Sequence, residues 1–319
     1  MRRLVVFALA LLVIAGGAAF YAWNGPGPAP KALSVVVPEG GTLRTAAREL
    51  EKAGAIGSSQ RFLLLARVFG GQGVIRAGEY EVPKGASARA ILDLLQSGKT
   101  MQRFVAVPEG MPSILVYEKL IANPLLTGPI PMPAEGSVLP DSYSYTRGEP
   151  RAAVLKRMTA AMDKTLARLW AARKPSTVAR TPEEAVTLAS IVEKETGVPA
   201  ERRMIAGVYS NRLRIGMPLQ ADPTVIYPVT KGKPLGRRIL QSELRADNGY
   251  NTYARPGLPE GPIANPGRAS IAAVLDPAPT NALYFVANGQ GGHVFADTLA
   301  EHNANVAKWY ALRRARGEM

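Results

Sequence analysis

The sequence predicts an α+β protein with an N-terminal transmembrane helix, a small α+β module and a larger mixed domain. Three observations lead to this prediction. The chain opens with an uncharged run of roughly the 20 residues that cross a bilayer. Three later segments each join a strand-like run to a helix-like run through a Val-Pro-x-Gly turn. The second half mixes helical periodicity with long loops rich in Gly, Pro, Asn and Tyr.

Composition narrows the function classes. The chain has 319 residues, 47% of them hydrophobic and 20% charged, which indicates one large or two medium packed domains. A net charge of +14 suits a polyanionic neighbour, but no basic run is interleaved with aromatic residues and no zinc-finger or RNA-recognition signature occurs, so we expect no nucleic-acid partner. The absence of cysteine excludes disulfides, thiol nucleophiles and Cys-ligated metals.

We also expect no metal and no cofactor. The two histidines, His293 and His302, lie nine residues apart without an HExxH pattern. The sequence has no Gly-x-Ser-x-Gly elbow, P-loop or Rossmann fingerprint. The glycine cluster 289–292, GQGG, is typical of a hairpin turn rather than of a phosphate cradle.

The first element in chain order is the apolar run Leu4–Trp23, which predicts a membrane anchor over residues 1–23. Arg2 and Arg3 precede it. Paired basic residues hold such an N-terminus in the cytoplasm, so everything after Trp23 should face the other side of the membrane.

A cleaved signal peptide is the alternative, because Leu4–Ile14 followed by AGGAA resembles a signal core with a small-residue cleavage site. The length of the run favours the anchor, as do Tyr21 and Trp23, which would lie at the far membrane interface. Residues 24–33, which include NGPGPAP, then form a Pro/Gly linker that keeps the first folded domain off the membrane.

The three Val-Pro-x-Gly units begin near Ser34, Tyr80 and Phe104. Each turn precedes a helix-start residue and apolar residues at helical spacing; the start residues are Thr42, Ser87 and Pro112. Unequal spacings exclude a solenoid. We therefore expect a small βααβ module over 34–101, which resembles LysM-type carbohydrate-binding modules, and a second domain over 102–319. The helix expected at 61–68, RFLLLARV, is apolar enough to be mostly core.

The stretch EGSVLPDSYSYTRG, which starts at Glu135, predicts a loop or short strand before a scaffold helix over 150–173. Its tyrosines, Tyr143 among them, could stack on sugar rings, and Asp141 could hydrogen-bond a ligand. Pro-Asp-Ser is equally ordinary turn chemistry.

The segment Thr181–Gly197, TPEEAVTLASIVEKETG, predicts a helix with Thr181 as its N-cap and Gly197 beyond its end. Glu195 projects from the apolar stripe of this helix, because it lies seven, four and three residues after Leu188, Ile191 and Val192. A carboxyl among aliphatic side chains loses hydration, and its pKa rises towards the value that a general acid needs. Glu195 is therefore the candidate acid, while Glu193 points away from the stripe; a solvent-exposed, ion-paired Glu195 is the alternative.

After a further helix expected at 200–215, long polar loops fill the sequence. Loops of this composition on a rigid scaffold expose the amide, hydroxyl and aromatic groups that bind polysaccharide, although plain irregular surface is the other interpretation. Asp222 before Pro223 could also be a turn residue. Each cleft candidate could instead have a structural role; the candidates are Gln220, Asp222, Tyr227, Tyr250, Asn251 and Tyr253.

Four motifs carry a family resemblance: ASIVEKETG, RLRIGMPLQADPTVIY, YNTYARPGLPEGPIANPG and YFVANGQGGHVF. With them, nearly the whole chain resembles the YceG-like family of membrane-anchored endolytic murein transglycosylases. The resemblance implies a single-pass anchor in the inner membrane, a LysM-like subdomain and a periplasmic catalytic domain with a lysozyme-like catalytic helix. The second Glu of E-K-E-T, here Glu195, is then catalytic. The chain departs from the family pattern at Ser137 and Val138, which replace aromatics before LPDSY.

The resemblance further implies cleavage between N-acetylmuramic acid and N-acetylglucosamine of nascent peptidoglycan, leaving 1,6-anhydro ends and terminating strand elongation, with peptidoglycan synthases as further partners. One carboxyl can do both proton transfers. Two alternatives stay open. A hydrolase would add Asp141 or Asp222 as a second carboxylate, and a non-catalytic scaffold would only bind the cell wall.

Overall fold

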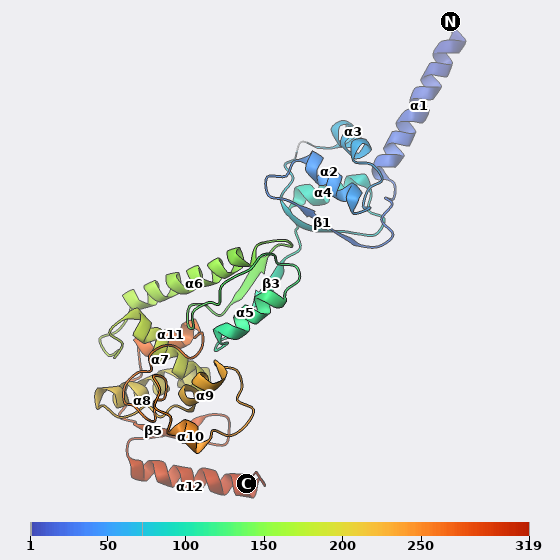
Figure 1. Cartoon of the computed structure of the whole chain (residues 1–319). Helices are drawn as coiled ribbons and strands as arrows, with labels where there is room; N and C mark the ends of the chain where they lie inside the picture. Colours follow the sequence, from blue (N-terminus) through green and yellow to red (C-terminus); the bar gives the residue numbers. More distant parts are fainter. Residues whose placement is uncertain (1, 72, 319) are drawn as a thin grey trace. The chain divides into compact units, whose positions relative to one another are not determined.

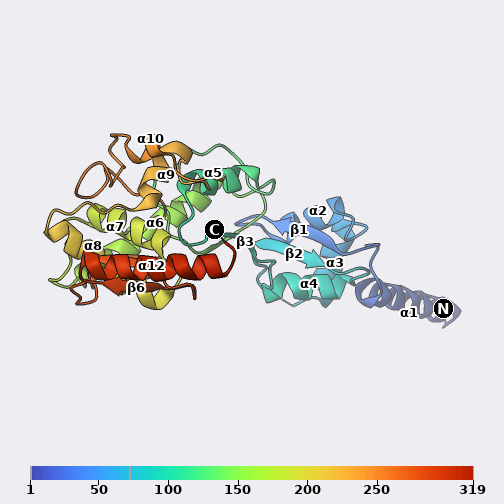
Figure 2. The same ribbon diagram turned by 90° about the horizontal axis from the view of Figure 1, so that it is seen from below.

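The computed structural model describes residues 2–71 and 73–318 and has a mixed α+β architecture (Figures 1 and 2). The chain divides into two compact units. Unit 1 comprises Met1–Arg103 with Ser144–Gly148, and unit 2 comprises Phe104–Tyr143 with Glu149–Met319. The predicted α+β class with an apolar N-terminal helix is confirmed at this level.

Helix α1 (Arg2–Asn24) is long and apolar enough to cross a membrane by length and composition, and its apolar window is not buried by the rest of the protein. Its last turn behaves differently. Trp23, expected at a membrane interface, is only 4% exposed and packs with ring-centroid distances of 6.3 Å on both Phe62 and Phe69 of α3 (Ser59–Phe69). The end of α1 is thus part of the core of unit 1.

The Pro/Gly segment after α1 is bound to the module. Gly27 N donates to Gly85 O at 3.1 Å, and Gly85 N donates to Ala29 O at 3.0 Å. These bonds satisfy backbone groups on both segments. The segment therefore lies along the module instead of forming a free spacer.

The module has the expected βααβ order. Strand β1 (Leu33–Val37) pairs antiparallel with β2 (Gly78–Val82), with Val35 opposite Tyr80, and α2 (Leu43–Lys52), α3 and α4 (Ala88–Ser97) accompany them. Thr42 and Ser87 cap α2 and α4 as predicted, by accepting hydrogen bonds from Thr45 N and Ala90 N.

Helix α3 buries only one face. Phe62 and Leu65 lie in the core, whereas Leu64 and Val68 are 62% and 64% exposed. The expectation that 61–68 is mostly core is wrong for this outer face. The run places apolar residues on all sides of the helix, whereas a helix packed on a small module buries only one face.

The strand–turn–helix pattern recurs at all three Val-Pro-x-Gly units. Gly40, Gly85 and Gly110 have φ values of 72°, 65° and 73°, a left-handed conformation that glycine adopts without a Cβ clash. The third unit joins β3 (Arg103–Ala106), which pairs with β4 (Ser142–Tyr145), to α5 (Ser113–Ala122).

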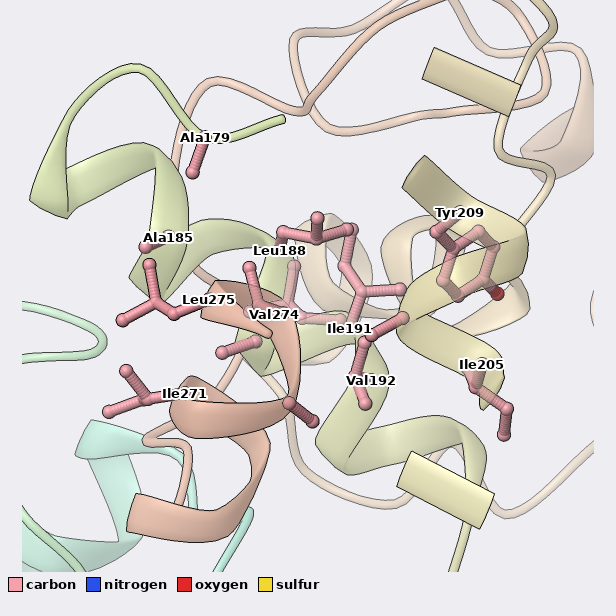
Figure 3. Close-up of a cluster of buried hydrophobic side chains, with 14 of the residues drawn as sticks. Ala179, Ala185, Leu188, Ile191, Val192, Ile205, Tyr209, Ile271, Val274 and Leu275 are labelled. Carbon is pink, nitrogen blue, oxygen red and sulfur yellow. The ribbon is translucent and has the colours of Figure 1, made fainter. Parts of the chain in front are cut away.

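Unit 2 is built around α7 (Pro182–Glu195). Residues 185–192 are all buried, so the middle of α7 is covered on every side. Figure 3 shows side chains of α7, α8 and α11 meeting in this core. The other elements are α6 (Arg151–Ala171), α8 (Arg202–Arg214), α9 (Asp222–Thr230), α10 (Gln241–Leu244), α11 (Arg268–Leu275), the antiparallel pair β5 (Tyr284–Ala287) and β6 (His293–Ala296), and α12 (Leu299–Ala315).

The ends of α7 follow the predicted signals. Thr181 Oγ1 accepts from Glu184 N at 3.2 Å, and Glu184 Oε2 accepts from Arg180 N at 2.7 Å. The helix stops at Glu195 because Thr196 is extended and its hydroxyl accepts from Val198 N at 2.9 Å. A short 3₁₀ turn, Pro199–Glu201, delays the start of α8 beyond the expected residue 200.

Candidate active site

A cavity of about 300 Å³ lies at the C-terminal end of α7. Helices α7, α8, α9 and α12, strand β5 and two loops contribute to its wall. The lining side chains are Glu195, Tyr209, Arg212, Gln220, Asp222, Tyr253, Phe285 and His302. The cavity therefore combines a helix-terminal carboxyl with polar and aromatic groups, the kind of lining that binds a polar ligand.

Glu195 has the environment of a general acid. Its side chain is half-buried as a whole, but Oε1 has no solvent contact and no hydrogen-bond partner. Burial raises the pKa of this carboxyl to about 7. Hydrogen bonding from Tyr209 and the charge of Arg212 lower this pKa, and the charge of Asp222 raises it, but burial sets the direction. The carboxyl can thus hold and release a proton near neutral pH.

Arg212 is a buried cation at the cavity wall and is only 7% exposed. Its Nε donates to Leu283 O at 2.6 Å and its Nη1 to Leu219 O at 2.7 Å. Burial lowers the pKa of Arg212, but a guanidinium stays protonated at pH 7. Burial also raises the pKa of Tyr209, so this phenol stays neutral and can donate a hydrogen bond.

Asp222 and Tyr253 form a second polar pair in the cavity. The Tyr253 hydroxyl donates to Asp222 Oδ1 at 2.6 Å, and burial followed by this contact raises the tyrosine pKa. Gln220 has φ of 50°, rare for a residue with a Cβ, and its N–H donates to Thr252 O at 3.1 Å. Ala221 N donates to Thr252 Oγ1 at 3.1 Å. The two loops that supply the pair are therefore fixed to each other.

Four of the predicted site residues meet in this cavity, and the structure places the other five elsewhere. Asn251 is 2% exposed, and its Nδ2 donates to three loop carbonyls, those of Glu243, Leu244 and Ala246. Tyr227 and Tyr250 pack together with ring centroids 4.8 Å apart. These residues organise the loops behind the cavity, and a direct contact with sugar stays a prediction.

Asp141 immediately precedes β4 and Tyr143 lies within it, and neither residue lines the cavity. Asp141 Oδ1 accepts from the adjacent Ser142 N at 2.7 Å. The Tyr143 hydroxyl donates to Leu139 O at 2.6 Å, and burial raises the pKa of Tyr143 to about 12. Their proposed sugar contacts likewise stay predictions.

Sequence reasoning missed Tyr209, Arg212, Phe285 and His302. A signal existed for the first two, because they follow Ile205 by four and seven residues and so share the inward face of α8. Phe285 and His302 come from β5 and α12, and only the tertiary fold brings them to Glu195.

Glu193, two residues before Glu195, is held by contacts within the protein and does not line the cavity. Its Oε2 accepts from Gly267 N at 2.7 Å, and its Oε1 lies 3.3 Å from Arg202 Nη2, with the Glu193 side chain 4% exposed. His293 is likewise engaged, because its Nδ1 lies 2.7 Å from Glu201 Oε2. Within residues 2–71 and 73–318, no group of three or more potential ligands is arranged to hold a metal ion.

Comparison with known proteins identifies the family of this chain. The sequence profile of the YceG-like family matches residues 35–308. The chain belongs to the YceG-like family. A relative from Bacillus subtilis (strain 168), named endolytic murein transglycosylase, is 30% identical, and the match covers 94% of this chain and 92% of the relative. A relative of the same name from Streptococcus pneumoniae (strain D39) is 29% identical. That match covers 87% of this chain and 58% of the relative, which is the longer protein.

A solved structure shows a similar fold. The crystal structure of a YceG-like protein from Listeria monocytogenes matches with a TM-score of 0.53 and 26% identity. The match covers 86% of this YceG-like chain and 98% of the other.

Proposed function

We propose that this YceG-like protein is an endolytic murein transglycosylase that cleaves the bond between N-acetylmuramic acid and N-acetylglucosamine in nascent peptidoglycan. The observation that carries the proposal is the buried Glu195 carboxyl, whose pKa of about 7 suits proton transfer in both directions. The names of the two relatives support the same activity. Cleavage within a growing strand would terminate its elongation beside the peptidoglycan synthases.

Glu195 can perform both steps of this reaction. Protonated Glu195 donates to the glycosidic oxygen while the bond from that oxygen to muramyl C1 breaks. The resulting carboxylate takes the proton of the muramyl 6-hydroxyl, whose oxygen bonds to C1 and closes the 1,6-anhydro ring. Asp222, held by Tyr253, can stabilise the positive charge that develops at C1. The reaction consumes no water, and α7 takes the part of the acid-bearing helix of lysozyme-like enzymes.

Mass spectrometry of the products tests this function. The protein should convert polymerised lipid-linked glycan into fragments with 1,6-anhydro ends, each lighter by one water than a reducing end. Reducing ends would instead favour a hydrolase with Asp222 as the second carboxylate, since this residue shares the cavity with Glu195. The absence of any cleavage would favour a cell-wall-binding scaffold.

We also propose that α1 anchors the protein in the inner membrane with unit 2 in the periplasm. The support is the apolar length of α1 and the preceding arginines, Arg2 and Arg3. Full-length protein should stay with membrane vesicles after carbonate washing, and protease added to spheroplasts should digest unit 2. A soluble periplasmic form that begins after Ala19 would contradict this topology and indicate a cleaved signal.

The βααβ module over 34–101 is, we propose, a LysM-like subdomain that holds glycan strands for the catalytic domain over 102–319. Its strand–helix order supports this proposal. Deleting residues 34–101 while retaining α1 should weaken binding to purified glycan strands and leave some cleavage. Loss of all cleavage in a variant whose unit 2 remains folded would show that the module contributes to the catalytic cleft.

A further inference from the structure

A second cavity, of about 510 Å³, lies in unit 2. The third Val-Pro-x-Gly turn, residues 107–110, supplies part of its lining, together with the end of α7, the start of α9 and the loop 232–235. The proposed transglycosylase reaction uses none of these lining residues.

Two short backbone segments contribute to both cavities. Lys194 lines this second cavity and the next residue, Glu195, lines the active-site cavity. In the same way Pro223 lines the second cavity and Asp222 the first. Consecutive Cα atoms lie about 3.8 Å apart, so the backbone that carries Glu195 and Asp222 also borders the second cavity.

The lining of the second cavity differs from that of a sugar site. It contains no aromatic, hydroxyl or amide side chain among the described residues; instead it has prolines, aliphatic side chains and Met111, with two lysines and one glutamate. Sugar rings are bound by aromatic faces and by amide or carboxylate groups. This lining suits small apolar side chains next to an anionic group.

Lys194 is the cation available to such an anion. The other charged residues of the lining are already paired: Glu109 Oε2 lies 3.0 Å from Arg202 Nη2, and Lys233 Nζ lies 2.6 Å from Glu118 Oε1. Lys194 has no ion pair within the described part of the chain. The Lys194 Cδ would lie 3.5 Å from a Cβ added at Gly110, so the aliphatic part of the Lys194 side chain runs along the Val-Pro-x-Gly turn. Lys194 thus lines a largely apolar cavity without an ion-pair partner in the described residues, while Glu109 in the same lining is paired with Arg202.

Glycine also shapes the opposite wall. Gly232 has φ of 83°, and a Cβ there would lie 2.7 Å from Pro112 Cβ. The loop after α9 can therefore approach the turn closely, and the cavity between them has a defined outline.

We propose that this second cavity binds the stem peptide that is linked to the muramyl residue held at Glu195. Lys194 pairs with a stem carboxylate, and the aliphatic lining receives the small side chains of the stem. Lys233, which already pairs with Glu118, adds positive charge at the same cavity. The proposal rests on the proposed function, because only a peptidoglycan strand carries this peptide on the reacting sugar. The stem fits better than the prenyl pyrophosphate, because the stem is linked to the reacting muramyl residue itself, whereas the prenyl pyrophosphate is attached only at the end of the strand and the proposed cleavage is endolytic.

The test compares three forms of one uncrosslinked strand: intact, stripped of stems by an amidase, and freed of its prenyl pyrophosphate with the stems kept. The full-length wild type should cleave stem-bearing strands with a higher kcat/KM than stem-free strands. Lys194→Met should reduce this preference roughly 2- to 5-fold, the effect expected for one partly exposed charge pair. Lys194→Arg should keep it. Lys156→Met on the outer face of α6 is the matched control.

Direct titration with a free stem tetrapeptide separates this proposal from the proposed function. Wild type should bind the peptide more tightly than Lys194→Met, whether or not strands are cleaved. Equal cleavage of intact and stem-free strands by wild type would overturn the proposal, as would an unchanged preference in a Lys194→Met/Lys233→Met double variant. A preference lost only with the prenyl group would assign the cavity to lipid and also overturn it. Peptide binding without cleavage would contradict the transglycosylase assignment alone.

Discussion

Glu195→Gln should lower kcat for release of anhydro products by a factor on the order of 10² to 10⁴, because the amide keeps the shape of the side chain but cannot donate and retake a proton. The measurement is single-turnover cleavage of lipid-linked glycan. Release at the wild-type rate would show that another group is the acid.

The same substitution, which lowers kcat, should raise the stability of the folded protein. The folded-state pKa of Glu195 is about 7, above its ordinary value of 4.5. Its protonated form is therefore favoured in the folded protein, and stability is lost as pH rises through 4.5 towards 7. Glu195→Gln should gain stability relative to wild type between pH 4 and pH 8, by at most about 3 kcal/mol. Equal stability differences at both pH values would contradict the raised pKa.

Glu193→Gln is the matched control on the same helix. It weakens the contact with Arg202 and the bond from Gly267 N, so it should cost roughly 1 to 3 kcal/mol of stability. Its kcat should stay within about 10-fold of wild type below the unfolding temperature, since Glu193 does not line the active-site cavity. If only Glu193→Gln abolished cleavage, the assignment of the catalytic acid would be wrong.

Arg212→Met should lower the free energy of unfolding by about 2 to 5 kcal/mol, because the buried carbonyls of Leu283 and Leu219 lose their donor. It also removes the cation that lowers the pKa of Glu195. That pKa should rise further, and the upper pH limit of activity should move to higher pH.

Chemical denaturation and the pH dependence of kcat measure the two effects of Arg212→Met. Arg214→Met, two residues along α8 and exposed, should change stability by less than about 1 kcal/mol. Equal losses in both variants, or an upper pH limit that moves down, would contradict the role given to Arg212.

The sequence predicted the elements that local signals determine. The N-cap of Thr181, the stop after Glu195 and the glycines of the Val-Pro-x-Gly turns need only short-range geometry, and each lies where its pattern indicates. Trp23 shows the limit of such reasoning. Its position at the end of an apolar run is equally consistent with a membrane interface and with the core of a small module, and only packing against Phe62 and Phe69 decides between them.

The candidate site was predictable where one helix determines it. The spacing of Glu195 from Ile191 and Val192 was enough to find the buried carboxyl. The roles of the loop residues were not predictable from the sequence. Asn251 and Tyr227 are residue types that often bind ligands, but here the Asn251 amide hydrogen-bonds loop carbonyls and the Tyr227 ring packs on Tyr250. His302 reaches the cavity from α12, more than a hundred residues after Glu195, and no local pattern encodes that approach.

Direct titration of the Glu195 carboxyl tests the central claim most closely. With ¹³C-labelled glutamate carboxyls, the signal present in wild type and missing in Glu195→Gln identifies this group by NMR. We predict that it titrates with a midpoint near pH 7, well above the ordinary 4.5. A midpoint at or below 4.5 would mean that the carboxyl is ionised at neutral pH, and Glu195 could not then be the general acid.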